Sequence, residues 1–256
     1  MLIASWNVNS VKARLPNVLD WLAQAQPDVV LLQELKCQDD GFPALEFQSA
    51  GYASAVHGQK SYNGVAILSK HPMHDVRMGL PGDPDDSQAR WVEATVEGVR
   101  VVSLYLPNGN PAPSEKFDYK LGWMDRMIDH AGNLLATEQP VILGGDYNVC
   151  PTDRDVYDPQ GWKEDALCRP QSRSKFRQLL NMGYWEAFAS LHPDYDRAWT
   201  FWDYQAGAWP RDLGLRIDHF LLSPQAADRL EECRIDREPR GKEKASDHTP
   251  ILVKLI

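Results

Sequence analysis

The chain has 256 residues, of which 43% are hydrophobic and 25% are charged, and its formal net charge is −9. This composition excludes disordered, collagen-like and coiled-coil proteins, and no apolar run approaches the roughly 20 residues that cross a bilayer. Because the segment Met1–Trp6 has neither a basic start nor a cleavage signal, we expect a cytoplasmic protein with no membrane partner. Since no repeats, low-complexity tracts or linker-like runs occur, we expect a single domain over residues 1–256.

Apolar runs typical of strands recur along the chain between Gly, Pro, Asn and Asp residues. They cover residues 2–8, 28–34, 64–69, 91–96, 99–106, 140–145, 217–222 and 249–255. Helical periodicity appears from Leu15 to Leu22, from the start signal at Ser114 to Leu135, and over 174–182 before Gly183. Since the strands between 52 and 106 follow one another too closely for parallel crossovers, we expect an α/β fold with two packed, mainly antiparallel sheets flanked by helices.

Polar residues stand at the ends of several predicted strands, where a rigid scaffold presents side chains to a shared site. They are Asn7, Glu34, Asp146, Asn148 and Asp218. In an extended chain, residues two apart project to the same side, so Asp146 and Asn148 would face one site together. The carboxylate can orient or deprotonate water, and the amide can bind a phosphate oxygen. Asn7 and Asn9 repeat the same spacing.

A metal-dependent hydrolase is the class that these residue types favour. Glu34 follows the apolar run 29–33, where a carboxylate must be paired, protonated or bound to a cation such as Mg²⁺. His248 can stabilise charge on a phosphate as an imidazolium if a carboxylate holds it, and the spacing leaves both Asp218 and Asp247 open as that partner. No nucleophile elbow, Walker loop or activated cysteine is present, which favours water activated by a metal ion. The four cysteines form no zinc or disulfide pattern.

Seven segments, taken in order, resemble the exonuclease III family within the endonuclease/exonuclease/phosphatase superfamily. They are Trp6-Asn7-Val8-Asn9, Leu32-Gln33-Glu34-Leu35-Lys36, Tyr62-Asn63-Gly64-Val65-Ala66, Tyr105-Leu106-Pro107-Asn108-Gly109, Gly145-Asp146-Tyr147-Asn148-Val149, Gly214-Leu215-Arg216-Ile217-Asp218-His219 and Ser246-Asp247-His248. The resemblance implies a four-layer α/β sandwich like that of deoxyribonuclease I. It also implies a Mg²⁺-dependent DNA phosphodiesterase of base excision repair. Such an enzyme cleaves 5′ to abasic sites and trims 3′ ends as a 3′→5′ exonuclease or 3′-phosphodiesterase.

The resemblance also assigns the metal and water sites. Glu34 would be the main ligand of Mg²⁺, for which Mn²⁺ can substitute, and Asn7 and Asp247 would lie close to the metal. Asp146 would position or deprotonate the attacking water, while Asn148 would help to orient that water and the phosphate. Both residues would therefore also lie in the metal region.

The remaining roles that the resemblance implies concern the phosphate and the DNA. His248, paired with Asp218, would contact the scissile phosphate, and Tyr105 would donate its hydroxyl there. Arg90 and Lys120 match positions that touch the DNA backbone. The partner would be duplex DNA with abasic sites or 3′ ends, bound by a monomer.

An apolar pocket for a flipped-out deoxyribose without a base is the last feature that the resemblance implies. Its lining would be Phe201, Trp202, Leu215 and Ile217. The chain departs from the family pattern at Gln205 and Ala189, where many relatives carry Arg, and Leu215 occupies a position that is Trp in another branch. The two lost cations leave the balance between abasic-site incision and 3′-end trimming open.

Two other functions compete with this hypothesis. A phosphatase or sphingomyelinase acting on a small or lipid phosphate would share the hydrolytic residues but would lack the DNA-contacting elements. A catalytically inactive DNA-binding module would not need Glu34, Asp146, Asn148 and His248 together. The net negative charge argues against nucleic acid at first, but a few placed cations suffice to bind phosphates.

Overall fold

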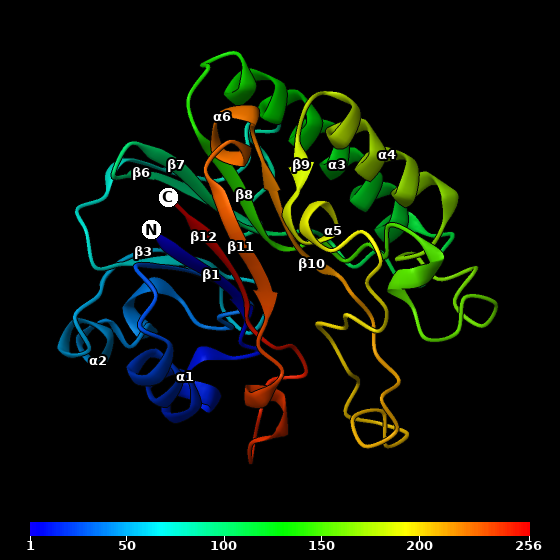
Figure 1. Ribbon diagram of the computed structural model, residues 1–256, viewed down its shortest axis with the longest axis horizontal. Coiled ribbons are helices and arrows are strands. Elements are labelled where there is room, and N and C mark those ends of the chain that lie inside the picture. The colour runs from blue at the N-terminus through cyan, green and yellow to red at the C-terminus, as the bar shows by residue number, and fades with distance from the viewer.

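Two six-stranded sheets form the centre of the molecule, which a computed structural model describes over residues 1–256 (Figure 1). The first has the order β11-β12-β1-β2-β4-β3, with β11 Leu230–Ile235, β12 Ile251–Leu255, β1 Leu2–Asn7, β2 Val29–Gln33, β4 Val65–Ser69 and β3 Ala53–His57. The second has the order β5-β6-β7-β8-β10-β9, with β5 His74–Met78, β6 Trp91–Val96, β7 Val99–Tyr105, β8 Val141–Asp146, β10 Asp218–Leu222 and β9 Trp185–Glu186.

The pairing of the strands aligns several polar residues. β1 pairs with β2 and β7 pairs with β8 in parallel, whereas all other pairs are antiparallel. In the second sheet, Tyr105 and Asp218 are both register partners of Asp146. The first and last strands, β1 and β12, are neighbours, and the amino group of Met1 donates to the carbonyl of Leu255 at 2.7 Å.

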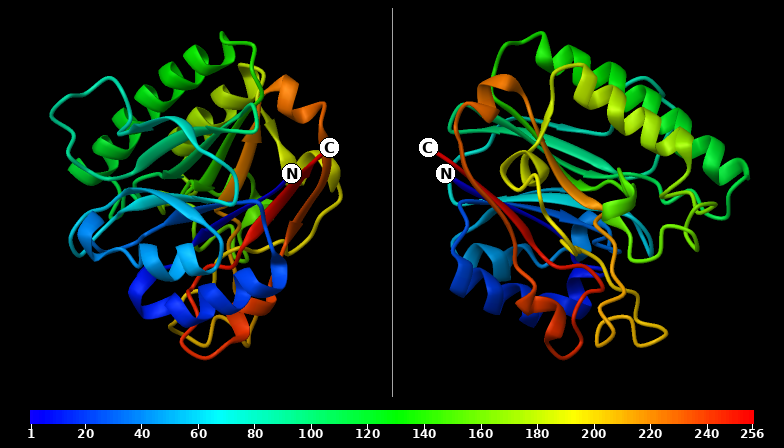
Figure 2. Two further views of the ribbon diagram at one scale, coloured as in Figure 1. Left: turned by 90° about the vertical axis from the view of Figure 1, so that its left-hand side faces the viewer. Right: turned by 45° about the vertical axis from the view of Figure 1, so that its right-hand side comes forward.

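Helices cover the outer faces of both sheets, which gives four layers (Figure 2). α1 and α2 lie on the first sheet, and α3 and α4 lie on the second. The helices are α1 Val11–Ala25, α2 Ala44–Ser49, α3 Glu115–Leu135, α4 Pro170–Asn181, α5 Ala187–Leu191 and α6 Pro224–Ala227, with 3₁₀ turns at Asp39–Gly41, Asp153–Asp155 and Glu238–Gly241. None of these helices is long and apolar enough to cross a membrane.

The core consists of three apolar layers between these four structural layers. The middle layer joins the two sheets and includes Ile3 from β1 and Ile142 from β8. The next residue along each strand faces the other way, so Ala4 packs under α1 and Leu143 packs under α3. Because both faces of these strands are buried, their sequences are continuously apolar and easily recognised.

Every strand expected from the sequence is present, with bounds that differ by at most two residues. The expected helix starting at Ser114 is also confirmed, since the Ser114 hydroxyl accepts a hydrogen bond from the amide of Phe117 at 3.3 Å. The strands that the sequence did not indicate are β3, β5, β9 and β11, which are short or polar. All five residues of β5 are exposed, and such polar edge strands lack the apolar pattern on which recognition depends.

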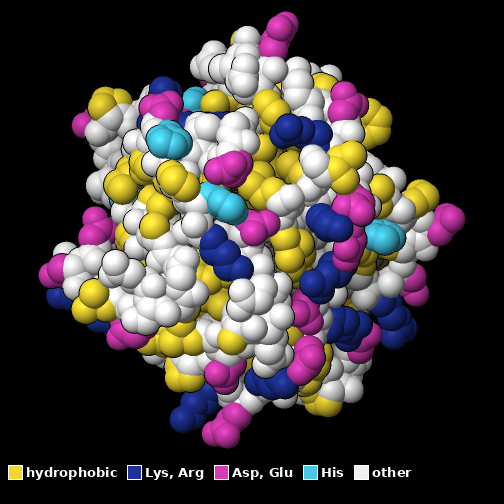
Figure 3. All heavy atoms as spheres, turned by 60° about the vertical axis from the view of Figure 1, so that its left-hand side comes forward, with side chains coloured by type: hydrophobic (Ala, Val, Ile, Leu, Met, Phe, Trp, Pro, Cys, Tyr) yellow, Lys and Arg dark blue, Asp and Glu magenta, His cyan; other side chains and the backbone are white.

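Charge is distributed rather than concentrated on the surface that Figure 3 presents. Acidic and basic side chains are interspersed there, and the hydrophobic side chains form small separate groups.

Gly145 allows the closest approach between β7 and β8. A Cβ atom added at this position would lie 2.0 Å from the carbonyl oxygen of Leu104, which is its register partner. That oxygen belongs to the backbone of the neighbouring strand, so a side chain at 145 forces the two strands apart next to Asp146.

We therefore expect Gly145→Ala to lower the free energy of unfolding by about 1–3 kcal/mol, the usual cost of overpacking a core. The measurement is chemical or thermal denaturation followed by circular dichroism. Gly122→Ala is the matched control. Gly122 lies inside α3 with open space around it, so alanine there should stabilise the protein by up to about 1 kcal/mol. Equal stability of both variants would contradict this account of the strand contact.

Candidate active site

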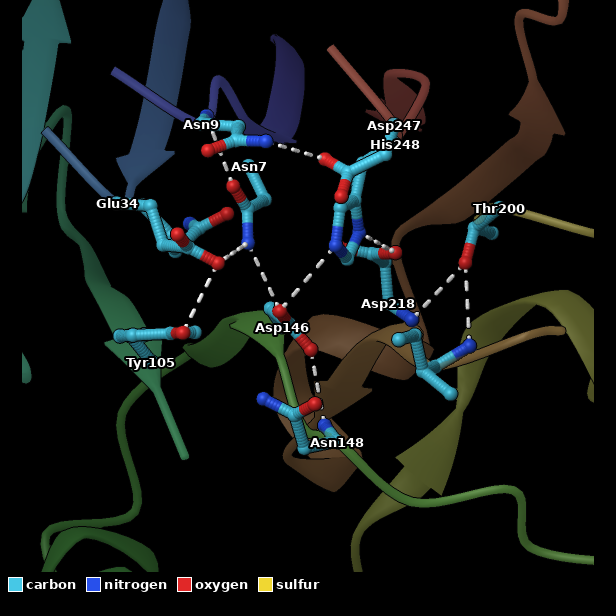
Figure 4. Close-up of polar contacts among 12 residues, drawn as sticks. Asn7, Asn9, Glu34, Tyr105, Asp146, Asn148, Thr200, Asp218, Asp247 and His248 are labelled. Carbon is cyan, nitrogen blue, oxygen red and sulfur yellow. Dashed lines mark hydrogen bonds and ion pairs between the residues drawn. The ribbon is translucent and has the colours of Figure 1, made fainter. Parts of the chain in front are cut away.

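Polar side chains from both sheets meet at one end of the sandwich (Figure 4). They come from the end of β1, the residue after β2, the ends of β7 and β8, the start of β10 and the segment before β12, namely Asn7, Glu34, Tyr105, Asp146, Asp218 and His248. Possible ligand atoms of Glu34, Asp146 and His248 all lie within 4.8 Å of one another. The structure therefore brings together residues that are separated by more than 200 positions in sequence.

Asn7 joins the two sheets at this point. Its side-chain nitrogen donates to Glu34 Oε1 and to Asp146 Oδ2, each at 2.9 Å. Its side-chain oxygen Oδ1 accepts from the backbone N–H of Asn9 at 3.0 Å. Asn7 is fully buried, and its amide presents N–H groups to the two carboxylates. This orientation makes Asn7 a group that positions the carboxylates, because its oxygen is directed toward the backbone of Asn9.

The segments Asn7–Asn9 and Asp146–Asn148 form two turns of the same kind. Asn9 and Asn148 have positive φ angles of 44° and 46°, and the amide of each donates to the side chain two residues earlier. The expectation that Asp146 and Asn148 lie in an extended chain is therefore wrong. The side chain of Asp146 caps the turn instead, as Asp and Asn side chains commonly do.

His248 is held by Asp218, which resolves the choice between Asp218 and Asp247. Its Nδ1 lies 2.8 Å from Asp218 Oδ2, and its Nε2 lies 3.6 Å from Asp146 Oδ2. Burial alone would lower the pKa of this imidazole, but Asp218 and Asp146 outweigh burial and raise the pKa to about 10. The Thr200 hydroxyl accepts hydrogen bonds from the backbone amides of Ile217 and Asp218 and so fixes the start of β10.

The carboxylates of Asp146 and Glu34 differ in protonation behaviour. Burial, with Asp218 nearby, raises the pKa of Asp146 to about 7 against the opposing effect of His248. The pKa of Glu34 is lowered, because Lys36 and Asn7 outweigh the effect of burial, and Lys36 Nζ lies 3.0 Å from Glu34 Oε2. The Tyr105 hydroxyl donates to Glu34 Oε1 at 2.9 Å, and burial beside these carboxylates raises the pKa of Tyr105 well above its usual value. Tyr105 is thus a proton donor at neutral pH.

Lys120 does not lie on the surface. Its side chain is completely buried, and Nζ donates to the carbonyl oxygens of Asn108 and Asn148 at 3.0 and 2.6 Å. Burial lowers its pKa to about 7. In this conformation Lys120 holds the turn that carries Asn148, and its contact with a DNA backbone stays a prediction. The side chain of Asn148 is itself fixed by Asn108 and the carbonyl of Leu106.

Arg90 lies beside Tyr105 at the edge of the cluster. Its guanidinium is 4.8 Å from the centre of the Tyr105 ring, and it donates to Gln88 and to the backbone carbonyl of Tyr105. Asp247 lies on the opposite side of the cluster, where its Oδ1 accepts from the side-chain Nδ2 of Asn9 at 3.1 Å. Asp247 is not among the groups that lie within 4.8 Å of one another.

The residues expected to line an apolar pocket are divided between two clusters. Leu215 and Ile217 are 1% and 2% exposed and pack with Leu167 and neighbouring apolar side chains, while Phe201 packs at the edge of this group. Phe201 also contacts His248, with ring centres 5.0 Å apart. Trp202 belongs to a separate cluster with Trp199, Ala208 and Trp209, so the structure does not bring it together with the other three.

The family of the chain follows from comparison with known proteins. The model of the Endonuclease/Exonuclease/phosphatase family matches residues 4–248, which includes every polar residue of the cluster. The chain belongs to this family. Exodeoxyribonuclease III of Haemophilus influenzae is 32% identical to it over 263 aligned residues, which cover 98% of both chains.

Solved structures of the same family have nearly the same fold. The 3′ phosphatase NExo from Neisseria, bound to a product DNA hairpin, is 42% identical with a TM-score of 0.97, and the match covers 100% of this chain and 99% of that one. An AP endonuclease from Archaeoglobus fulgidus is 35% identical with a TM-score of 0.95, again over 100% and 99% of the two chains. The predictions of the family, of the four-layer sandwich and of an exodeoxyribonuclease III-type hydrolase are confirmed.

A buried ionic network, which the sequence did not reveal, packs behind the polar cluster. Arg216 donates to Asp155 at 2.7 Å and to Glu186 at 2.9 Å, and all three residues are buried. His219 is fully buried beside them, with Nε2 3.0 Å from the carbonyl of Val149. The network thus ties the strand that carries Asp218 to the turn that carries Asn148. The only signal in the sequence was that Arg216 and His219 flank Asp218.

The pairing of His248 with Asp218 predicts a change in the imidazole titration. In Asp218→Asn the carboxylate that favours the charged imidazole is lost, so the pKa of His248 should fall by about 1–3 units. The measurement is an NMR titration of the metal-free protein. The imidazolium of the wild type should persist to about pH 10, and that of the variant should lose its proton at lower pH. Asp228→Asn, at an exposed position outside the cluster, should leave the titration unchanged. An unshifted midpoint in Asp218→Asn would refute the pairing.

Proposed function

We propose that the chain is a Mg²⁺-dependent DNA phosphoesterase that processes 3′ ends of duplex DNA and cleaves 5′ to abasic sites. The observation that carries the proposal is the grouping of Glu34, Asp146 and His248 within 4.8 Å, in a family whose members include exodeoxyribonuclease III. The names of the two solved relatives, a 3′ phosphatase and an AP endonuclease, support DNA phosphoesters as the substrate class.

The chemistry of the donors fits a hard divalent cation. Glu34 and Asp146 offer carboxylate oxygens, and Mg²⁺ commonly takes only one or two protein carboxylates. Asp218, close behind them, pairs with His248 through Oδ2, and its buried Oδ1 has no hydrogen-bond partner. Glu34 would be the main ligand, with Asp146 beside it. When bound, the ion supplies positive charge to a phosphate oxygen and makes water more acidic.

The residues of the chain account for the other steps of hydrolysis. Asp146, with a pKa near 7, is suited to accept a proton from the attacking water, and Asn7 and Asn148 hold its carboxylate through hydrogen bonds. His248 remains an imidazolium through Asp218 and would donate to a phosphate oxygen as charge develops there. The Tyr105 hydroxyl would provide a second donor once it leaves Glu34.

The packing around Leu215 favours 3′ ends over abasic sites. A flipped-out sugar requires an open apolar pocket, but Leu215 and Ile217 are almost completely covered and pack with Leu167. Opening this cluster costs contacts that a 3′ terminal phosphate does not require. We therefore infer that the 3′-processing activity exceeds the abasic-site activity.

A side-by-side assay tests the activity and this order. We expect the protein with Mg²⁺ to remove a 3′ phosphate or trim a recessed 3′ end at least about tenfold faster than it cuts an abasic-site duplex, a difference of only about 1.4 kcal/mol in barrier. Chelator should abolish both reactions. Asp146→Asn should lower both rates by several orders of magnitude, since the water loses its base, whereas Asp228→Asn should not. If neither substrate is cut with Mg²⁺, the proposed function is wrong, and if the abasic duplex is cut faster, the inferred order is wrong.

A further inference from the structure

A cavity of about 370 Å³ that is rich in cations lies beside the group of Glu34, Asp146 and His248, which we call the acidic cluster. We call it the basic pocket. It is formed by the start of α1, the loop after Phe201 and the segment before Ser246, with the lining residues Ala13, Arg14, Tyr204, Arg240, Lys242, Lys244 and Ala245. Four of these residues carry positive charge, and none carries negative charge, in a chain whose net charge is −9.

Three of the four cations in the basic pocket lack an acidic partner. Arg14, Arg240 and Lys244 form no ion pair with any Asp or Glu, whereas Lys242 pairs with Glu238 at 2.6 Å. Concentrated charge of one sign attracts a ligand of the other sign, and most strongly where low-dielectric walls surround it. The basic pocket therefore favours an anionic ligand.

The two arginines carry unused donors. Arg240 is 8% exposed, and its Nε is buried without a partner, although its terminal nitrogen donates to the carbonyl of Trp202 at 3.0 Å. Arg14 Nε is also buried and unpaired, while its terminal nitrogens bind the carbonyl of Asn9 at 2.6 Å and the Tyr204 hydroxyl at 2.9 Å. These contacts are all to neutral oxygens, so no carboxylate neutralises either guanidinium, and both can attract an anion.

The basic pocket is connected to the acidic cluster through Asn9, which contacts both Arg14 and Tyr204. The Tyr204 hydroxyl accepts from Arg14 at 2.9 Å and from the Asn9 amide at 3.3 Å. The same side-chain nitrogen of Asn9 donates to Asp247 Oδ1 at 3.1 Å. The backbone N–H of Asn9 donates to the side-chain oxygen of Asn7. A polyanion whose one phosphate lies at the acidic cluster would thus place another phosphate near the basic pocket.

We propose that the basic pocket binds a second phosphate group of the DNA substrate, distinct from the ester that is hydrolysed. The proposal rests on the proposed function and adds a binding subsite to it. Arg14 and Arg240 supply the planar donors that suit phosphate oxygens, and Lys244 supplies an exposed charge at the rim. The subsite explains how an acidic protein holds a polyanion, because phosphate contacts supply most of the affinity for DNA.

The test is DNA binding by a variant with two of the cations replaced, Arg14→Gln with Lys244→Gln. The double variant and its reference protein, which retains Arg14 and Lys244, both also carry Asp146→Asn, which keeps the DNA intact in Mg²⁺. Fluorescence anisotropy with a labelled duplex that has a recessed 3′ end gives Kd at several salt concentrations. We expect Kd to rise about tenfold, and the slope of log K against log salt to become shallower by about 0.7–0.9 for the lost phosphate contact.

The matched control is Arg229→Gln, which removes the charge of an exposed, unpaired arginine. Arg229 precedes the first residue of β11, whereas the pocket residues Arg240 and Lys244 follow the last one. It should leave Kd and the salt slope unchanged. Lys244→Glu alone, at an exposed side chain, should weaken binding as well and guards against misfolding of the double variant, which thermal melting also checks. Unchanged Kd and salt slope in both pocket variants would overturn the proposal.

Inorganic phosphate distinguishes the two sources of the anion. If the variants lose affinity for inorganic phosphate in isothermal titration but bind duplex DNA as before, the pocket takes a free phosphate and the DNA subsite is wrong. Loss of affinity for the duplex supports the subsite. The proposed function fails separately, when the wild type with Mg²⁺ hydrolyses no DNA substrate; a protein that hydrolyses DNA but whose pocket variants bind normally refutes only the subsite.

Discussion

The structure depends on burying several carboxylates around one imidazole. Asp146 and Asp218 are 1% and 2% exposed, and like charges at such depth repel one another unless a cation lies between them. His248 fills this role with one nitrogen toward each carboxylate. The cost of desolvating the three groups is met by their mutual attraction and by the amide of Asn7, and removing one partner leaves an uncompensated buried charge. The same ion pairs that would serve the proposed chemistry therefore also hold these residues together.

The sandwich makes this arrangement possible because the two sheets place strand ends at one edge. β1 and β2 run parallel and deliver Asn7 and Glu34 next to each other, and β7 and β8 do the same for Tyr105 and Asp146. Residues with left-handed backbone follow β1, β2 and β8, namely Asn9, Glu34 and Asn148, so the chain turns sharply at the site. Each sheet thus contributes a rigid half of the site, and packing between the sheets sets the distance between the halves.

Much of this could be predicted from the sequence, because the central strands are continuously apolar and end in polar residues. Edge strands such as β5 and β11 could not, since their exposed residues carry no pattern. The direction of the Asn148 side chain depends on a left-handed turn, and the burial of Lys120 depends on two carbonyl groups that only the fold brings together. The spacing of residues along the sequence indicates neither the Asn148 turn nor the burial of Lys120. The separation of Trp202 from Phe201 likewise arises from tertiary packing.

The adjacency of β1 and β12 has a consequence for synthesis of the chain. Glu34 and Asp146 are synthesised well before His248, and β12, which follows His248, must then pair between β1 and β11. A nascent or C-terminally truncated chain would hold the carboxylates without the imidazolium that neutralises them. Completion of the first sheet is thus coupled to assembly of the cluster of Glu34, Asp146 and His248, so a chain that ends before His248 lacks the proposed active site.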